Sequence, residues 1–307
     1  MSAPIIAAYG EGIMYPPNLA TNMTAIQTAG WNTIIAGLFH ISSAGDIGFN
    51  DVPSVVSGGS YVGDSTWPAQ LAQLVQPGGG NTVVTMLASF GGGGVGDFTN
   101  IQNIYQNNGN SFSGTALESN FQTFFKALPS ITLLDMDVED NYDQPSFVAF
   151  CQMLAQIGFG LTFCPYAPWE MSFWTGSLAA LNQSNPGAVK WWNLQCYDGG
   201  NGNDPQTWAA AIAAAIPGFN TAGFIVAGDW SRNLAKPYSN PATWYWQGDC
   251  PPAVNALLST FQSEACVGGG FIWTIDQIVN YAADEKQKAD PNSCGNVDMQ
   301  TYVAAMP

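Results

Sequence analysis

This chain of 307 residues has very little positive charge. Lysine and arginine together number six, against 22 aspartates and glutamates, which gives a formal net charge of −16 at pH 7. Nucleic-acid binding needs clusters of basic side chains that neutralise phosphates, and the sequence contains no such cluster. The same shortage argues against phosphorylated substrates and anionic membranes. Charged residues make up only 9% of the chain, so a neutral ligand such as a sugar fits the composition better.

Motifs for metal binding and nucleophilic catalysis are also scarce. His40 is the one histidine, and no two of the six cysteines are spaced as Cys-x-x-Cys, so no structural zinc site is expected. Serine–histidine catalysis would depend on His40, for which the sequence shows no partner. Cys164 and Cys196 lie in apolar runs and are expected to be buried thiols. A disulfide between Cys250 and Cys266 is our hypothesis for one pairing.

Long apolar runs and nucleotide-binding loops are missing as well. No apolar run approaches 18 residues, so no transmembrane helix is expected. The chain enters an apolar strand directly after Met-Ser-Ala-Pro, which is not the pattern of a signal peptide. The glycine-rich stretch 91–94 lacks the Lys-Ser or Lys-Thr pair of a phosphate-binding loop.

The chain does contain a regular alternation of short apolar runs and segments with helical character. The runs predict eight strands, at 5–9, 33–41, 82–89, 132–138, 160–164, 189–197, 223–227 and 269–274. The clearest helices are predicted at 22–29, 68–75, 116–128, 145–157, 205–216 and 251–263. Eight such units predict a (β/α)8 TIM barrel of class α/β, with residues 1–307 as a single domain. An open doubly wound sheet is the alternative, but the dinucleotide fingerprint is missing after the first strand.

Three carboxylates occupy alternate positions at the end of the fourth predicted strand. Asp135, Asp137 and Glu139 therefore share one face of the strand, roughly 6 to 7 Å apart. Crowding of like charges and low dielectric both raise a carboxyl pKa, which suits a general acid. Two other interpretations stay open. The acids could keep an exposed edge strand soluble, or they could bind a hard cation together with Asp140 and Asp143.

Polar and aromatic residues stand at other predicted strand ends, where the active sites of such barrels lie. Gln195 and Tyr197 are two residues apart and share a face, and Asp198 follows them. Trp273, at the end of the eighth strand, offers a flat apolar surface to a sugar ring. Further sugar-binding candidates are Tyr9, Phe39 and Trp169. Five tryptophans in loop-like segments could line a groove or pack in the core: Trp169, Trp174, Trp230, Trp244 and Trp246.

Together these motifs resemble glycoside hydrolase family 18, the chitinases and endo-β-N-acetylglucosaminidases. The family's Asp-x-x-Asp-x-Asp-x-Glu signature is matched by residues 132–139, with Thr132 in place of the first acid. Its Ser-x-Gly-Gly motif is matched by residues 89–92, its strand-six motif by 195–198, and its strand-eight tryptophan by Trp273. Residues 161–165 are similar to the compact, hevamine-like plant-type branch.

The resemblance implies a retaining, substrate-assisted mechanism that needs no metal or organic cofactor. Glu139 would protonate the glycosidic oxygen while the substrate's own acetamido oxygen attacks the anomeric carbon. Asp137 would turn from Asp135 toward Glu139, after sharing a proton with Asp135 in the resting state. Tyr197 would hold the acetamido oxygen, with Asp198 beside it.

The function implied by the resemblance is that of an endo-acting chitinase, which hydrolyses β-1,4-N-acetylglucosamine linkages. We expect it to be a monomer and extracellular, its signal peptide removed, with chitin or an N-acetylglucosamine oligosaccharide as partner. One alternative is an endo-β-N-acetylglucosaminidase acting on N-glycan cores. Another is a non-catalytic chitin-binding lectin, although such members typically lose the glutamate or central aspartate that Glu139 and Asp137 represent here. A metal-dependent barrel hydrolase is disfavoured by the single histidine.

Two structural expectations follow from the same resemblance. Only about 40 residues separate Ala227 from Gly269, too few for the α/β domain that some members insert there. We therefore expect an open, shallow groove that favours internal cleavage. The family often has a non-proline cis peptide after the strand-eight tryptophan, so Trp273–Thr274 is expected to be cis.

Overall fold

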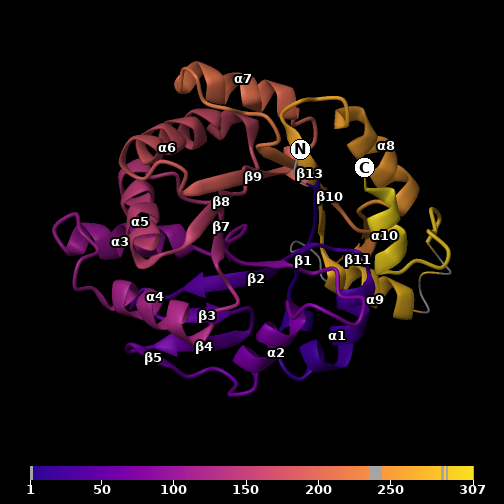
Figure 1. The fold of residues 1–307 in the computed structure, drawn as a ribbon, viewed down its shortest axis with the longest axis horizontal. Helices are drawn as coiled ribbons and strands as arrows, with labels where there is room; N and C mark the ends of the chain where they lie inside the picture. Colours follow the sequence, from indigo (N-terminus) through magenta and orange to yellow (C-terminus); the bar gives the residue numbers. More distant parts are fainter. Residues whose placement is uncertain (1–2, 236–243, 285–286, 288–289, 307) are drawn as a thin grey trace.

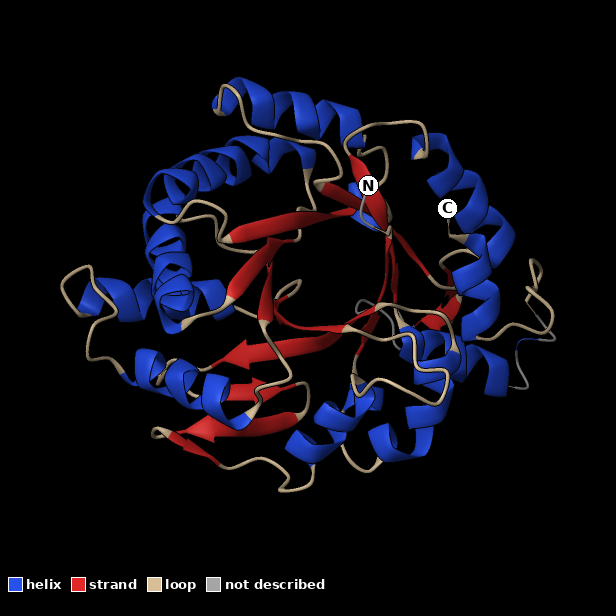
Figure 2. Cartoon of the chain, in the orientation of Figure 1, coloured by secondary structure: helices blue, strands red, loops and turns tan. Residues whose placement is uncertain are grey.

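Eight parallel strands close into a barrel that is surrounded by helices (Figures 1 and 2). The computed structural model describes residues 3–235, 244–284, 287 and 290–306. Strand β1 pairs with both β2 and β13, which closes the barrel in the order β1-β13-β10-β9-β8-β7-β6-β2. The predicted (β/α)8 barrel is confirmed. Its strands are β1 (Ile5–Gly10), β2 (Thr33–Ile41), β6 (Thr85–Gly91), β7 (Leu133–Asp137), β8 (Gly160–Phe163), β9 (Val189–Gln195), β10 (Ile225–Trp230) and β13 (Val267–Trp273).

The barrel strands are buried on both faces, which explains their continuous apolar runs. One cluster of apolar side chains fills the inside of the barrel and includes Ala7, Ile35, Leu87, Val226 and Phe271. A second, larger cluster lies between the strands and the surrounding helices. The inner cluster reaches Cys164 and Tyr197, just past the carboxyl ends of β8 and β9, and the polar residues of the candidate site lie at the same end of the barrel.

Helices follow most of the strands, and all six predicted helices are present within a few residues of their expected bounds. Short polar side chains cap several of them; Asp143, for example, accepts a hydrogen bond from the amide of Ser146 at the start of α5. Among the described residues, no helix is long and apolar enough to cross a membrane. The helices are α1 (Asn18–Thr28), α2 (Trp67–Leu74), α3 (Asp97–Asn107), α4 (Ala116–Ala127), α5 (Gln144–Ile157), α6 (Met171–Ser184), α7 (Pro205–Ala215), α8 (Pro251–Phe261), α9 (Ile275–Ala283) and α10 (Met299–Ala305).

Two groups of short strands are present in addition to the eight barrel strands. The strands β3 (Ile47–Phe49), β4 (Val52–Ser57) and β5 (Ser60–Tyr61) extend the sheet outward from β2 in antiparallel fashion. The strands β11 (Asn233–Ala235) and β12 (Tyr245–Gln247) form an antiparallel pair between β10 and α8. The described residues between β10 and β13 form this strand pair, α8 and their connections.

The disulfide joins Cys250 to Cys294, so the hypothesis of a Cys250–Cys266 bridge is wrong. Cys250 is the N-cap of α8, whereas Cys266 follows the far end of that helix. An 11-residue helix is about 16 Å long, far beyond the reach of a disulfide. Cys294 comes instead from the C-terminal segment, and its Cα lies 5.3 Å from that of Cys250. Cys164 and Cys196 are buried free thiols, as predicted.

Candidate active site

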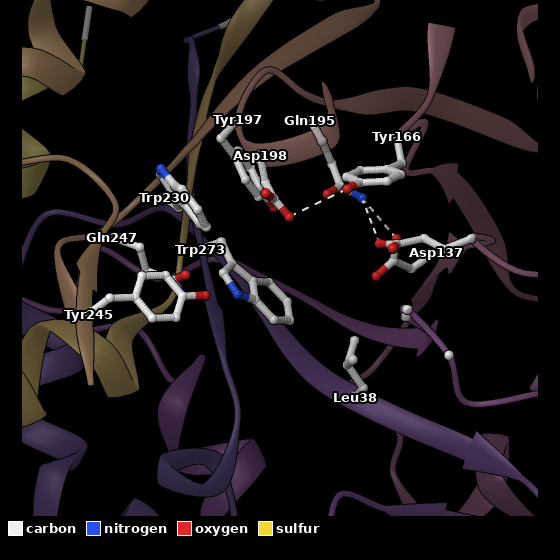
Figure 3. A pocket seen from close by; sticks show the side chains of 14 residues that line it. Leu38, Asp137, Tyr166, Gln195, Tyr197, Asp198, Trp230, Tyr245, Gln247 and Trp273 are labelled. Carbon is white, nitrogen blue, oxygen red and sulfur yellow. Dashed lines mark hydrogen bonds between the residues drawn. The ribbon is translucent and has the colours of Figure 1, made fainter. Parts of the chain in front are cut away.

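A cavity of about 730 Å³ opens at the carboxyl ends of the barrel strands (Figure 3). It is lined by acids and aromatic rings that come from different strands and loops. Those named in the figure include Asp137, Tyr166, Tyr197, Asp198, Trp230 and Trp273. Glu139, Leu38, Gln195 and glycines 92–94 complete most of the remaining wall. The cavity therefore lies where barrel topology predicts a site.

Asp135 lies at the base of the site, fully buried, and accepts four hydrogen bonds. Its Oδ1 accepts from Thr162 at 2.6 Å and from the amide of Asn193 at 2.9 Å. Its Oδ2 accepts from the hydroxyls of Tyr9 at 2.8 Å and Ser89 at 2.9 Å. The pKa of Asp135 is raised because burial outweighs the opposing effect of these four donors. Because all four groups donate to its oxygens, the carboxyl of Asp135 acts only as a hydrogen-bond acceptor.

Asp137 and Glu139 form the reactive pair above Asp135. Their carboxyls are hydrogen-bonded to each other. The side-chain amide of Gln195 donates to both, at 3.0 Å to Asp137 Oδ1 and 3.2 Å to Glu139 Oε1. The proton shared between Asp135 and Asp137, as the resemblance implies, finds no support in the geometry, because no hydrogen bond joins these two described carboxyls. All four donors around Asp135 already satisfy its oxygens, and Asp137 already faces Glu139.

Burial is the main cause of the perturbed acidity of this pair. It raises the pKa of Asp137 well above its usual value, and the charges of Glu139 and Asp135 raise it further. Burial also raises the pKa of Glu139, an effect that the hydrogen bonds from Gln195 and Asp137 oppose and the charge of Asp198 reinforces. Both pKa values therefore move upward, which is the direction that favours a general acid.

Glycine is required where β6 passes the acids. A side chain at Gly91 would collide with the carbonyl oxygen of Asp137, and its φ of +115° is in the region that favours glycine. A Cβ at Gly93 would lie 3.0 Å from Glu139 Oε2. The residues after β6 can thus approach the carboxyl pair because they lack side chains.

Aromatic rings form the wall opposite the acids (Figure 3). Tyr197 stacks on Trp230 with ring centroids 5.7 Å apart, and Trp273 contacts Tyr9 at 5.2 Å. The hydroxyl of Tyr197 makes no hydrogen bond to another described residue, so it is available to a ligand. The Trp273–Thr274 peptide is cis, as predicted, and Gly37–Leu38 is a second non-proline cis peptide. Asp198 accepts a hydrogen bond of 3.4 Å from Tyr166.

Three sequence-predicted sugar-binding residues lie elsewhere. Tyr9 is 1% exposed and supports Asp135 from below instead of lining the cavity. Phe39 is fully buried among Phe49, Phe90 and other rings on the helix side of β2. The pairing of β2 with β6 shifts register between Ala36 and Phe39. Side chains therefore stop alternating strictly at this point, and Leu38 lines the cavity in place of Phe39. Trp169 is 73% exposed and lies outside the lining.

The other four of these tryptophans differ in their places: one lines the cavity, two are packed against other rings and one is exposed. Trp230 lines the cavity. Trp174 is fully buried in α6, and Trp246 packs against Tyr281 with ring centroids 5.6 Å apart. Trp244 is 49% exposed and is not part of the cavity lining.

Sequence reasoning missed Tyr166, Tyr245 and Gln247, all of which line the cavity. Tyr166 comes three residues after β8, and extending the search past each strand end would have found it. Tyr245 and Gln247 belong to β12, and no sequence signal places that strand over the barrel mouth.

His40 has a partner after all. Its Nδ1 lies 2.9 Å from Oδ2 of Asp97, a nearly buried residue at the start of α3. Asp97 Oδ1 also accepts a hydrogen bond from the amide of Ile41, so this pair ties β2 to α3 outside the cavity. In the described part of the chain, no group of three or more histidine, cysteine, aspartate or glutamate side chains is arranged to hold a metal ion.

Comparison with known proteins shows the fold. No protein-family model matches the sequence, and no curated protein is significantly similar to it. A chitinase from Chromobacterium violaceum has a TM-score of 0.56 and 13% identity over 99% of this chain and 98% of its own. The Group IV chitinase of Ostrinia furnacalis has a TM-score of 0.61 and 12% identity, covering 98% of each chain. Human YKL-39, described as a pseudo-chitinase with retained chitooligosaccharide binding, has a TM-score of 0.61 and 11% identity over 99% of this chain and 98% of its own. The resemblance to this group predicted from the motifs is thus confirmed for the fold, over nearly the whole chain.

Proposed function

We propose that the protein is an endo-acting chitinase that hydrolyses β-1,4 linkages between N-acetylglucosamine units with retention of configuration. The observation that supports this most is the hydrogen-bonded pair of Asp137 and Glu139, with raised pKa values, facing Trp273 across a cavity of about 730 Å³. A carboxyl pair whose two members are hydrogen-bonded to each other suits a substrate that supplies its own nucleophile.

In this proposal a sugar unit lies over Trp273 and its glycosidic oxygen points at Glu139. Glu139 gives its proton to the leaving oxygen as the acetamido oxygen of the same sugar attacks the anomeric carbon. The bond to the leaving sugar breaks and a cyclic oxazolinium ion forms. Asp137 accepts a hydrogen bond from the acetamido N–H and stabilises the positive charge. Glu139 then takes a proton from the water that opens the ring.

Asp135 and Tyr197 assist without moving protons to the substrate. Asp135, fixed by its four donors, supports the neighbouring Asp137 without contacting the substrate. The Tyr197 hydroxyl donates to the acetamido oxygen and holds it in line for attack. Gln195 keeps the two upper carboxyls together. No step of this proposed mechanism passes through a metal or an organic cofactor.

We also propose how the enzyme cleaves long chains and where it acts. The described residues between β10 and β13 form no inserted domain, which favours an open groove and internal cleavage of long chains. Function as a monomer is proposed because one barrel carries the whole candidate site. Extracellular action is proposed because chitin is an extracellular polymer.

Two other functions use the same residues. An endo-β-N-acetylglucosaminidase would act on N-glycan cores through the same acids. A binding protein without catalysis, as human YKL-39 is described, is the second. The intact pair of Asp137 and Glu139 favours an enzyme over a lectin.

The test is product release from tetra- to hexameric N-acetylglucosamine, with wild type beside Glu139→Gln. The substitution removes the proton donor, and we expect the rate to fall about 10²- to 10⁴-fold. Glu118→Gln makes the same change on α4, outside the barrel, and should cleave like wild type. Cleavage of an N-glycan core but not of the oligomers would select the alternative enzyme. Equal activity of Glu139→Gln and wild type would refute the proposed acid.

A further inference from the structure

The hairpin of β11 and β12 forms one wall of the cavity. Asn233 pairs with Gln247, and Ala235 pairs with Tyr245. Because side chains alternate along a strand, Tyr245 and Gln247 share one face of β12, and both line the cavity. Trp246, between them, turns the other way and packs on Tyr281. The hairpin therefore presents one face to the cavity and fixes itself to α9 with the other.

The face that β12 presents is suited to a sugar. Tyr245 is 46% exposed, a large fraction for an aromatic ring that lines a cavity. Figure 3 shows Tyr245 and Gln247 beside Trp230 and Trp273, on the opposite side of the cavity from Asp137. An aromatic ring covers the apolar C–H face of a sugar, and a primary amide next to it can bond to hydroxyl or acetamido groups. These two residues lie beyond Trp273, where the proposed mechanism gives them no role.

A buried ion pair holds the base of the hairpin. Arg232 directly precedes β11 and is 9% exposed, and Asp290 is 5% exposed. Two hydrogen bonds join them, Nε to Oδ2 at 2.8 Å and Nη2 to Oδ1 at 2.7 Å. Nη1 of Arg232 donates to the carbonyl oxygen of Gly248, directly after β12, at 3.0 Å. One guanidinium thus ties both strands of the hairpin to the C-terminal segment.

The disulfide strengthens the same connection. Cys250 lies three residues after β12, and Cys294 lies four residues after Asp290. The hydroxyl of Tyr302 donates to the carbonyl of Asp249 at 2.9 Å. The C-terminal segment therefore holds the hairpin by a covalent bond, an ion pair and a hydrogen bond. Such an anchored wall loses little conformational entropy when a ligand binds.

We propose that Tyr245 and Gln247 form a sugar-binding subsite for a unit adjoining the one over Trp273, and that the Arg232–Asp290 pair and the Cys250–Cys294 disulfide are its positioning elements. This inference rests on the proposed function. It makes the hairpin a determinant of substrate length, since only an oligomer long enough to reach β12 gains the contact.

The test measures binding without cleavage. In the Glu139→Gln background, dissociation constants for N-acetylglucosamine oligomers of one to six units are measured by titration calorimetry. Affinity should increase with length. Tyr245→Ala should weaken the longest oligomers about tenfold and leave the shortest ones that bind within about twofold, because these do not reach the hairpin. Tyr245→Phe keeps the ring and should bind like the parent.

Tyr105→Ala is the matched control, since it removes the same side chain from α3, outside the cavity. If the oligomers bind and Tyr245→Ala leaves the dependence on length unchanged, the subsite is refuted and the proposed function stands. If no oligomer binds at any length, the proposed function itself is refuted.

The anchor is tested in the active enzyme. Cys250→Ser/Cys294→Ser, and separately Asp290→Asn, should raise KM for the hexamer several-fold and leave kcat within about twofold. A purely structural role would lower the fraction of active enzyme and so lower kcat on short and long substrates alike. Equal loss on both would overturn the positioning role.

Discussion

The carboxyl of Asp137 is hydrogen-bonded to that of Glu139, and not to that of Asp135 two residues earlier. The three acids share one face of the strand end, so spacing alone allows either pairing. The choice is made by Tyr9, Ser89, Thr162 and Asn193, which occupy the oxygens of Asp135. The upper two acids are left to hydrogen-bond to each other.

Asp135→Asn should cost both stability and activity. The change replaces one acceptor oxygen by an NH2 group that faces two hydrogen-bond donors. We expect a loss of about 2–4 kcal/mol in the free energy of unfolding, together with a fall in kcat. Urea denaturation and oligomer cleavage measure the two effects, and the exposed Asp51→Asn serves as control. Unchanged stability would mean that the four hydrogen bonds do not require a carboxylate.

Asp198→Asn should move the basic limb of the pH profile of kcat/KM to lower pH. The charge of Asp198 raises the pKa of Glu139, so removing that charge lets Glu139 lose its proton at lower pH. The limb is measured on a soluble oligomer across the neutral and alkaline range. A limb that stays fixed would show that Glu139 is not the group whose deprotonation ends activity.

Gln195→Met should move the same limb in the opposite direction. The amide of Gln195 donates to Glu139, and this hydrogen bond lowers the pKa of Glu139. Methionine has a similar length but no N–H, so Glu139 should hold its proton to higher pH. Shifts of the same sign in Gln195→Met and Asp198→Asn would contradict this account of the site.

Asp229→Asn should remove a pH-dependent loss of stability. Asp229 is fully buried, and its Oδ2 has no hydrogen-bond partner among the described residues. Burial, together with the charge of Asp249, raises its pKa from 3.8 to about 7. The protonated form is the one the fold favours, so wild-type stability falls as pH rises from the unfolded pKa toward about 7.

Relative to wild type, Asp229→Asn should gain up to about 4 kcal/mol in the free energy of unfolding between acidic and mildly alkaline pH. Urea denaturation at several pH values measures the difference. Parallel curves for variant and wild type would show that Asp229 ionises in the fold without penalty.

Much of the fold and of the acid motif could be predicted because both depend on local pattern. Strands buried on both faces must be apolar throughout, so runs such as 33–41 mark the barrel directly. The period of two places Asp135, Asp137 and Glu139 together before any tertiary contact is known. Helices such as α6 were less clear from the sequence, because α6 has no proline at its first two positions and contains only two alanines.

The sequence by itself therefore determined the barrel, the three acids at one strand end and the aromatic residue Trp273. The tertiary structure decided which carboxyls pair, because the donors to Asp135 come from β1, β6, β8 and β9. It also decided that Leu38 and not Phe39 faces the cavity, through a register shift between neighbouring strands. The partner of Cys250 and the wall carried by Tyr245 likewise depend on segments brought together only when the barrel closes. Local periodicity determines the face of the strand on which a side chain lies. The residues that it contacts there come from segments far apart in the sequence, which meet only in the folded barrel.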